Sequence, residues 1–140
     1  MADSLRVVAT SQGGWAARVT ARSHELLVDE PPTAGGDDSG PMPTELLCAA
    51  LASCFCLALV HVATKRGQEL PELRVTVDAE RAGRELRYGR LRVEAEAAVD
   101  TGELAALVKQ ARPFCWVSNT LAEDLEVEYF PTVLHARPLS

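Results

Sequence analysis

The hydrophobic and polar residues of this chain are arranged around one long apolar segment. Between Leu46 and Val60 the only hydroxyl side chain is Ser53, and every other side chain is aliphatic, phenyl or thiol. Pro43 suits the first turn of a helix, and Gly67 suits the left-handed residue that follows one. The pattern therefore predicts a helix from Thr44 to Arg66. Because it is apolar around its whole circumference, other elements must surround it.

Short strands are expected before this helix. Three segments combine β-forming residues with some alternation of apolar and polar positions: Leu5–Thr10, Trp15–Ser23 and Glu25–Asp29. This pattern indicates an antiparallel meander. The next segment, Glu30–Met42, is rich in proline, glycine and aspartate and is expected to be a loop. A loop of this length is often functional or lies against a partner.

Two clearly alternating segments follow the helix. Leu73–Glu80 and Arg90–Val99 each place apolar residues on one face and charged residues on the other, with a turn expected around Gly83. The pattern predicts an antiparallel pair with one buried and one solvated face. Arginine and glutamate side chains on the outer face are expected to pair across the strands.

The remainder predicts two short helices and a strand. Asp100–Arg112 has a capping aspartate and an apolar side, which predicts an amphipathic helix. A second short helix is expected from Phe114 to Ala122. Leu125–Tyr129 alternates as a last strand, which Pro131 is expected to end.

Composition limits the class of protein. At 140 residues, with 47% hydrophobic and 24% charged residues, the chain is expected to form a single α+β domain over residues 1–140. The net charge of −6, without a basic stripe, argues against nucleic-acid and anionic-membrane partners. The apolar core is shorter than the roughly 20 residues that a membrane span needs. The N-terminus shows no signal-peptide core, so a cytoplasmic protein with reduced thiols is expected.

The cysteines are the candidate reactive groups. On a helix Cys48 and Cys56 point about 120° and 200° away from Cys54, so they are expected to be packing residues. Cys115 opens a helical turn, where the helix dipole would lower the pKa of its thiol. If the fold joins Cys54 and Cys115, they are able to attack a peroxide and close a disulfide, although spacing alone favours simple burial. His61 lies on the same helix face as Cys54, and its position near the helix C-terminus favours a simple charge interaction with the helix dipole. The cysteines and His61 do not match the spacing of a compact zinc site.

Two motifs resemble those of a known family. GPMPTELLCAALASCFCLAL, followed later by ARPFCWVSNTL, is similar to the paired signature of the OsmC and Ohr family, the osmotically inducible and organic-hydroperoxide-resistance proteins. The resemblance implies an α+β, OsmC-like fold, with antiparallel sheets packed around the long central helix. It also implies an intertwined homodimer, whose second subunit would help to cover that helix.

The resemblance also implies an activity. Enzymes of this family reduce organic hydroperoxides, with a peroxidatic cysteine at the position of Cys54 and a resolving cysteine at the position of Cys115. A lipoylated protein or a small dithiol is the usual reductant. Neither a cofactor nor a metal is implied.

Two polar positions depart from the family pattern. Thr44 stands where the peroxidases carry a glutamate, with Glu45 one place later. Trp15 follows the Gly-Gly turn where they carry an arginine. Arg18 or Arg22 is a candidate substitute for that arginine.

Two other functions stay open. One is a non-catalytic ligand-binding or redox-sensing dimer that keeps the fold without peroxidase activity, which the altered polar positions favour. The other is a hydrolase or transferase with Cys115 as its nucleophile, for which the sequence offers no triad partner.

Overall fold

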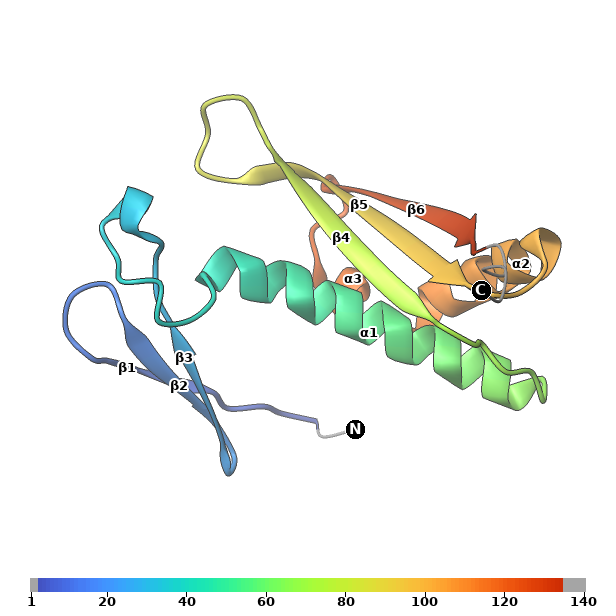
Figure 1. The fold of residues 1–140 in the computed structure, drawn as a ribbon, viewed down its shortest axis with the longest axis horizontal. Coiled ribbons are helices and arrows are strands. Elements are labelled where there is room, and N and C mark those ends of the chain that lie inside the picture. Colours follow the sequence, from blue (N-terminus) through green and yellow to red (C-terminus); the bar gives the residue numbers. More distant parts are fainter. Residues whose placement is uncertain (1–2, 135–140) are drawn as a thin grey trace, which may run out of the picture. The chain divides into compact units, whose positions relative to one another are not determined.

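The computed structural model describes residues 3–134 and divides the chain into two compact units, Met1–Leu47 and Cys48–Ser140. Helix α1 (Pro43–Lys65) contributes its first residues to the first unit and the rest to the second (Figure 1). The two units are described separately below, and the assignment of one domain stays a prediction.

The first unit contains the predicted meander. Strands β1 (Val8–Ser11), β2 (Ala17–Ala21) and β3 (His24–Val28) form an antiparallel sheet in the order β1-β2-β3. The strands are shorter than the alternating segments suggested, and β1 begins only at Val8. The arrangement of three sequential antiparallel strands is confirmed.

The long loop after β3 is built around one carboxylate. Asp29 is only 2% exposed, and its carboxylate accepts backbone N–H groups of Glu30 (2.7 Å), Asp37 (3.2 Å) and Ser39 (3.1 Å). The Ser39 hydroxyl donates a further hydrogen bond at 2.6 Å. These bonds, led by that from the Ser39 hydroxyl, lower the pKa of Asp29. The loop also contains a 3₁₀ turn, η1 (Pro32–Ala34), so it is an ordered segment.

Helix α1 begins and ends as its terminal residues predict. Pro43 is its first residue, and the carboxylate of Glu45 accepts the backbone N–H of Met42 at 2.9 Å, which satisfies a free donor at the helix start. Gly67 has φ 66° and follows the last turn, where the Gln68 N–H donates to the Ala63 carbonyl at 2.9 Å. This closing bond is typical of a Schellman motif.

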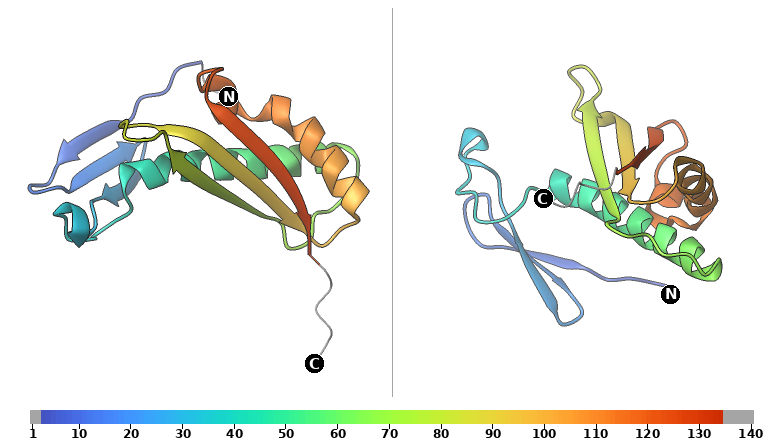
Figure 2. Two further views of the ribbon diagram at one scale, coloured as in Figure 1. Left: turned by 90° about the horizontal axis from the view of Figure 1, so that it is seen from above. Right: turned by 45° about the vertical axis from the view of Figure 1, so that its right-hand side comes forward.

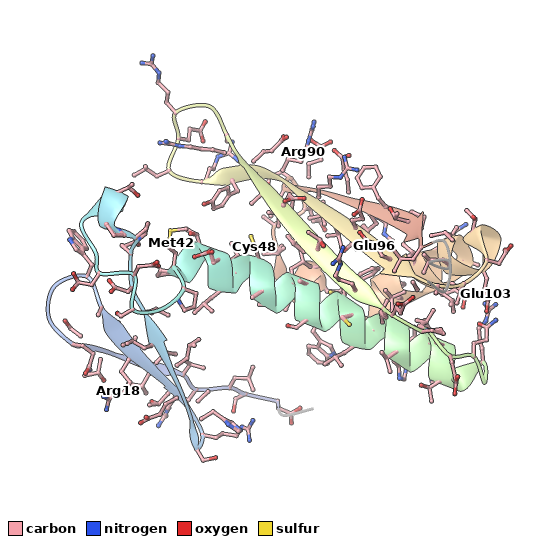
Figure 3. All side chains as sticks on the ribbon, viewed as in Figure 1. Arg18, Met42, Cys48, Arg90, Glu96 and Glu103 are labelled. Carbon is pink, nitrogen blue, oxygen red and sulfur yellow. The ribbon has the colours of Figure 1, made fainter. Side chains whose placement is uncertain are left out.

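The second unit holds the predicted antiparallel pair. Strand β4 (Arg74–Arg81) pairs with β5 (Tyr88–Ala97), and the turn between them contains Gly83 with φ 55°. Charged side chains pair across the outer face, as expected: Arg74 lies 3.0 Å from Glu96, and Arg90 contacts glutamates on both neighbouring strands, Glu80, Glu126 and Glu128. Arg90 projects from the sheet away from α1 (Figure 3).

The last strand pairs in a way that the sequence did not predict. After β5 the chain forms α2 (Thr101–Ala111), the 3₁₀ turn η2 (Arg112–Phe114) and α3 (Trp116–Thr120), and then returns as β6 (Glu126–Val133). Strand β6 pairs with β5 in parallel, so the helices form the crossover that parallel neighbours require (Figure 2).

The expectation that Pro131 ends this strand was wrong. Strand β6 continues through Pro131, which stands opposite Ala95, to Val133. The sheet order β4-β5-β6 makes β6 an edge strand. Proline is tolerated at an edge because its missing N–H removes no hydrogen bond when that side has no neighbouring strand. The short helix after Pro113 also ends earlier than predicted, at Thr120.

The core of the second unit joins α1 and α2 to the inner face of the sheet. Its fully buried large side chains are those of Leu51, Phe55, Leu59, Leu91, Val93, Leu104 and Leu107. Helix α1 buries one side in this core, whereas Leu57 on another side is 68% exposed and Val60 is 44% exposed. The α+β class is confirmed, and the helix carries more apolar surface than the described part of this chain covers.

Helix α1 is also long and apolar enough to cross a membrane by length and composition. Core helices of globular proteins meet the same criterion, and α1 buries one of its faces against the sheet. The buried face of α1 belongs to the core of the second unit.

Candidate functional site

The structure brings Cys54 and Cys115 together within the second unit. Cys54 is half-buried on α1, Cys115 is buried at the start of α3, and their thiols interact with each other. Cys54, Cys56 and Cys115 are free thiols. The two thiols of Cys54 and Cys115 are therefore neighbours in the second unit, and the roles of peroxidatic and resolving cysteine stay predictions.

Local structure explains how each thiol reaches this place. Cys54 precedes Phe55, which is fully buried and fixes the rotation of α1 about its axis. Cys115 follows the η2 turn that contains Pro113, and its φ of −88° and ψ of 100° interrupt the helical backbone before α3 begins. This break lets a residue between two helical turns be completely buried.

The surroundings of Cys115 correct one expectation. Burial raises the pKa of its thiol, and the nearby Cys54 acts in the same direction, while the hydroxyl and the backbone N–H of Ser118 act to lower it. The net shift is upward, so the prediction of a lowered pKa at a helix N-terminus was wrong. Helix α3 spans only Trp116–Thr120, and its weak dipole does not offset the cost of burying a thiolate.

Tyr129 is the site residue that sequence reasoning missed. Tyr129 lies on β6, and its ring packs on the ring of Phe55 with a centroid distance of 4.8 Å. The guanidinium carbon of Arg112 lies 4.6 Å from the centroid of the Tyr129 ring. Its hydroxyl interacts with Ser118 and also interacts electrostatically with the thiols of Cys54 and Cys115. Burial, the largest influence, raises the pKa of Tyr129. Alternation already placed this tyrosine on the inner face, where a buried hydroxyl needs a polar partner.

A pocket of about 440 Å³ opens beside this group. Arg112, Ser118 and Tyr129 belong to both the pocket wall and the surroundings of the thiols. The described residues that line it include neither cysteine. Its other lining residues, mainly apolar, are Pro113, Asn119, Leu121, Ala122, Glu123, Leu125 and Val127.

The other predicted site residues belong to the first unit. Arg18 lies on β2 and Arg22 in the turn after it, where it has φ 56°; both are exposed, and Arg18 projects from the meander in Figure 3. Thr44 and Glu45 lie in the first turn of α1, and Glu45 accepts the Met42 N–H described above. Their roles toward Cys54 stay predictions.

The remaining candidates on α1 have other surroundings. Cys48 and Cys56 are half-buried. His61 is exposed, and its ring contacts Phe114 at a centroid distance of 5.1 Å. Within residues 3–134 no group of three or more His, Cys, Asp or Glu side chains is arranged to hold a metal ion.

Solved structures with this fold carry related names. The chain aligns with an OsmC-like protein from Mycoplasma pneumoniae at a TM-score of 0.82 and 16% identity, over 96% of this chain and 100% of that chain. It aligns with the organic hydroperoxide resistance protein OsmC from Legionella pneumophila at 0.75 and 23%, over 93% and 97%. A putative organic hydroperoxide resistance protein from Vibrio cholerae, with captopril bound in one active site, gives 0.73 and 25%, over 94% of each chain.

No match was found among curated proteins. The model of the OsmC-like protein family matches residues 36–130, which include both cysteine motifs. This match covers more than half of the sequence and agrees with the fold and with the order of its elements. The chain therefore belongs to the OsmC-like protein family.

Proposed function

We propose that this protein reduces organic hydroperoxides, with Cys54 as the peroxidatic and Cys115 as the resolving cysteine. The observation that carries the proposal is that these two thiols, which come from segments far apart in the sequence, are neighbours in the core of the second unit. Membership of the OsmC-like family supports it, and so do the names of the structural relatives.

The proposed reaction has three steps. The Cys54 thiolate attacks the terminal oxygen of the hydroperoxide, the O–O bond breaks, and the alkoxide takes up a proton and leaves as an alcohol. The Cys115 thiolate then attacks the sulfur of the Cys54 sulfenic acid, the S–O bond breaks, and hydroxide leaves and is protonated to water. A dithiol reductant, free or on a lipoylated protein, reduces the new disulfide by exchange and is itself oxidised to a disulfide.

The proposal keeps the polar residues that the family resemblance suggests as support for Cys54. Arg18 or Arg22 is the candidate cation for the Cys54 thiolate and the peroxide, and Glu45, with Thr44, is the candidate for the missing family glutamate. Replacing each arginine by glutamine identifies the one that serves Cys54. The variant of that residue should slow Cys54 oxidation, whereas the other should not.

We also propose that the working form is a homodimer. Leu57 and Val60 of α1 are exposed in this chain, and Phe114 and Trp116 beside Cys115 are 49% and 59% exposed. Large apolar side chains left exposed on α1 and beside Cys115 are typical of an interaction surface. A second copy that covers them would enclose α1 and exclude water from the thiols, and a reducing cytoplasm is the proposed location.

The test is consumption of an organic hydroperoxide with dihydrolipoamide as reductant. Cys54→Ser should abolish turnover, and Cys115→Ser should leave a sulfenic acid on Cys54 after one equivalent of peroxide. Cys56→Ser is the matched control because Cys56 is another half-buried thiol on α1. Turnover unchanged in Cys54→Ser would refute the proposal.

A redox-inactive binding protein is the second candidate. The pocket of about 440 Å³ beside the thiols favours it, as does Trp15 at the place of the family arginine. Mass spectrometry after mild peroxide treatment separates the two candidates, since a binder with inert thiols gives neither a sulfenic acid nor a Cys54–Cys115 link. A hydrolase that uses Cys115 as nucleophile is disfavoured by the complete burial of this thiol.

A further inference from the structure

Cys115 must lose a proton before it resolves a sulfenic acid, yet its side chain is fully buried. Bulk water does not contact a thiol that is 0% exposed, so the proton has to leave through neighbouring polar groups. The groups that influence the Cys115 thiol are the Cys54 thiol from α1, Ser118 from α3 and, through its own interactions, Tyr129 from β6.

Ser118 is placed to accept that proton. Its hydroxyl donates to the Cys115 carbonyl at 3.2 Å, and it also interacts with the Cys115 thiol and with the Tyr129 hydroxyl. A hydroxyl has one hydrogen and two acceptor positions, and it rotates to suit its partners. Ser118 is therefore able to accept from the thiol and later to turn its hydrogen toward the thiolate.

Tyr129 continues the path toward solvent. Its ring is held between Phe55 and the Arg112 guanidinium, so the direction of its hydroxyl is fixed by packing on both sides. The positive charge of Arg112 strengthens the hydroxyl as a hydrogen-bond donor. Tyr129, Ser118 and Arg112 all line the open pocket, where water has access.

We propose that Ser118 and Tyr129 are positioning residues for Cys115, which pass the proton of its buried thiol to water in the pocket and then hold the thiolate with a hydrogen bond from Ser118. This inference rests on the proposed function, because it supplies the thiolate for the resolving step. The balance is complete: the thiol proton goes to pocket water, and the hydroxide displaced from Cys54 takes a proton from solvent to become water.

The first experiment needs no peroxide. Cys48, Cys54 and Cys56 are replaced by serine so that Cys115 is the one remaining thiol, and its thiolate is followed by ultraviolet absorbance against pH. Ser118→Ala should raise the pKa of the Cys115 thiol by about one unit. At a pH below the midpoint of the curve, this lowers the thiolate fraction about tenfold. Tyr129→Phe, which keeps the ring, should move the curve the same way by a smaller amount, and Ser118→Thr should restore it.

Matched controls separate this role from general loss of structure. Thr120→Ala removes another hydroxyl of α3, one that donates to the Trp116 carbonyl at 2.7 Å, and should leave the curve unchanged. Tyr88→Phe removes a phenol from β5, away from the pocket lining, and should also have no effect. Circular dichroism confirms that each variant is folded before its titration.

The second experiment follows the resolving step in the protein with all four cysteines. After one equivalent of hydroperoxide, Ser118→Ala should slow Cys54–Cys115 disulfide formation about tenfold, with Cys54 oxidation unchanged. A Ser118→Ala titration curve equal to that of the parent would overturn the inference. If the parent forms neither a Cys54 sulfenic acid nor a Cys54–Cys115 disulfide, the proposed function fails, and the peroxide-free titration still decides the role of Ser118.

Discussion

The ring of Phe55 packs against the ring of Tyr129 at a centroid distance of 4.8 Å and joins α1 to the edge strand β6. Each partner sits beside the thiol pair: Phe55 follows Cys54 in sequence, and the Tyr129 hydroxyl interacts with Ser118 next to Cys115. This contact therefore fixes the distance between the helix that carries one thiol and the residues that surround the other.

Loss of this contact should damage both stability and chemistry. Phe55 is completely buried, so Phe55→Ala should lower the free energy of unfolding by about 3–5 kcal/mol. It should also slow Cys54–Cys115 disulfide formation in the fraction that stays folded. Denaturant unfolding and mass spectrometry measure the two effects. Ser53→Ala, an exposed neighbour on α1, is the control and should change neither.

Association of two copies should depend on the exposed side of α1. Leu57 is 68% exposed within one chain, so Leu57→Glu costs little in a single folded chain but places a charge in the proposed interface. We expect sedimentation to change from the mass of two chains to that of one. The exposed residue Lys65 offers the control, Lys65→Glu, which should remain dimeric. Parent protein that sediments with the mass of one chain would contradict the dimer.

Acid should loosen the first unit through Asp29. The folded pKa of Asp29 lies below its ordinary value of 3.8, so the unfolded chain takes up this proton first as the pH falls. The stabilisation is complete well above 3.8 and is lost as the pH falls through the lowered folded pKa. Amide exchange of Asp37 and Ser39 reports it, because their N–H groups donate to this carboxylate.

Substitutions give this pH dependence a direct check. Asp29→Asn should expose the same amides to exchange at neutral pH and remove the change in acid. Asp38→Asn alters an exposed neighbour in the same loop and should keep the parent behaviour. Unchanged protection in Asp29→Asn would show that the loop is held by other contacts.

The start of α2 should depend on its capping residue. The Asp100 carboxylate accepts the backbone N–H groups of Gly102 at 3.0 Å and Glu103 at 3.3 Å. Asp100→Ala should lower the free energy of unfolding by about 1 kcal/mol, as measured in denaturant. Asp100→Ser keeps an acceptor and should recover most of this loss, whereas equal stability of the alanine variant and the parent would deny the cap a role.

Local signals predicted the elements that end in distinctive residues. Pro43 and Gly67 marked both ends of α1, Asp100 marked the start of α2, and alternation identified β4 and β5, because each signal acts within a few residues. The parallel pairing of β6 escaped prediction, since an alternating strand carries no information about which neighbour it joins or in which direction. Pro131 was misjudged for the same reason: only the sheet order shows that its strand lies at an edge.

For the candidate site too, the sequence identified some residues, whereas other features depend on the packed fold. The motifs around Cys54 and Cys115 identified the two thiols through their resemblance to a family. The raised pKa of Cys115 depends on how deeply the packed chain buries it, and the helix-terminus argument had no access to that depth. Tyr129 and Arg112 reach the thiols only through the crossover that brings β6 beside β5, so their place there could not be read from spacing.

The crossover also means that a disulfide between the two thiols would stabilise the fold. Cys115 is carried by the segment that links β5 to β6, and Cys54 by α1, so an oxidised bond between them would tie the crossover to the central helix and close a loop of about sixty residues. Restricting the unfolded chain in this way is worth about 4 kcal/mol in the loop-entropy estimate. The urea concentration at the midpoint of unfolding would then depend on the redox state of the protein. The oxidised form should unfold at a higher urea concentration than the reduced form, and treatment with a dithiol should remove the difference.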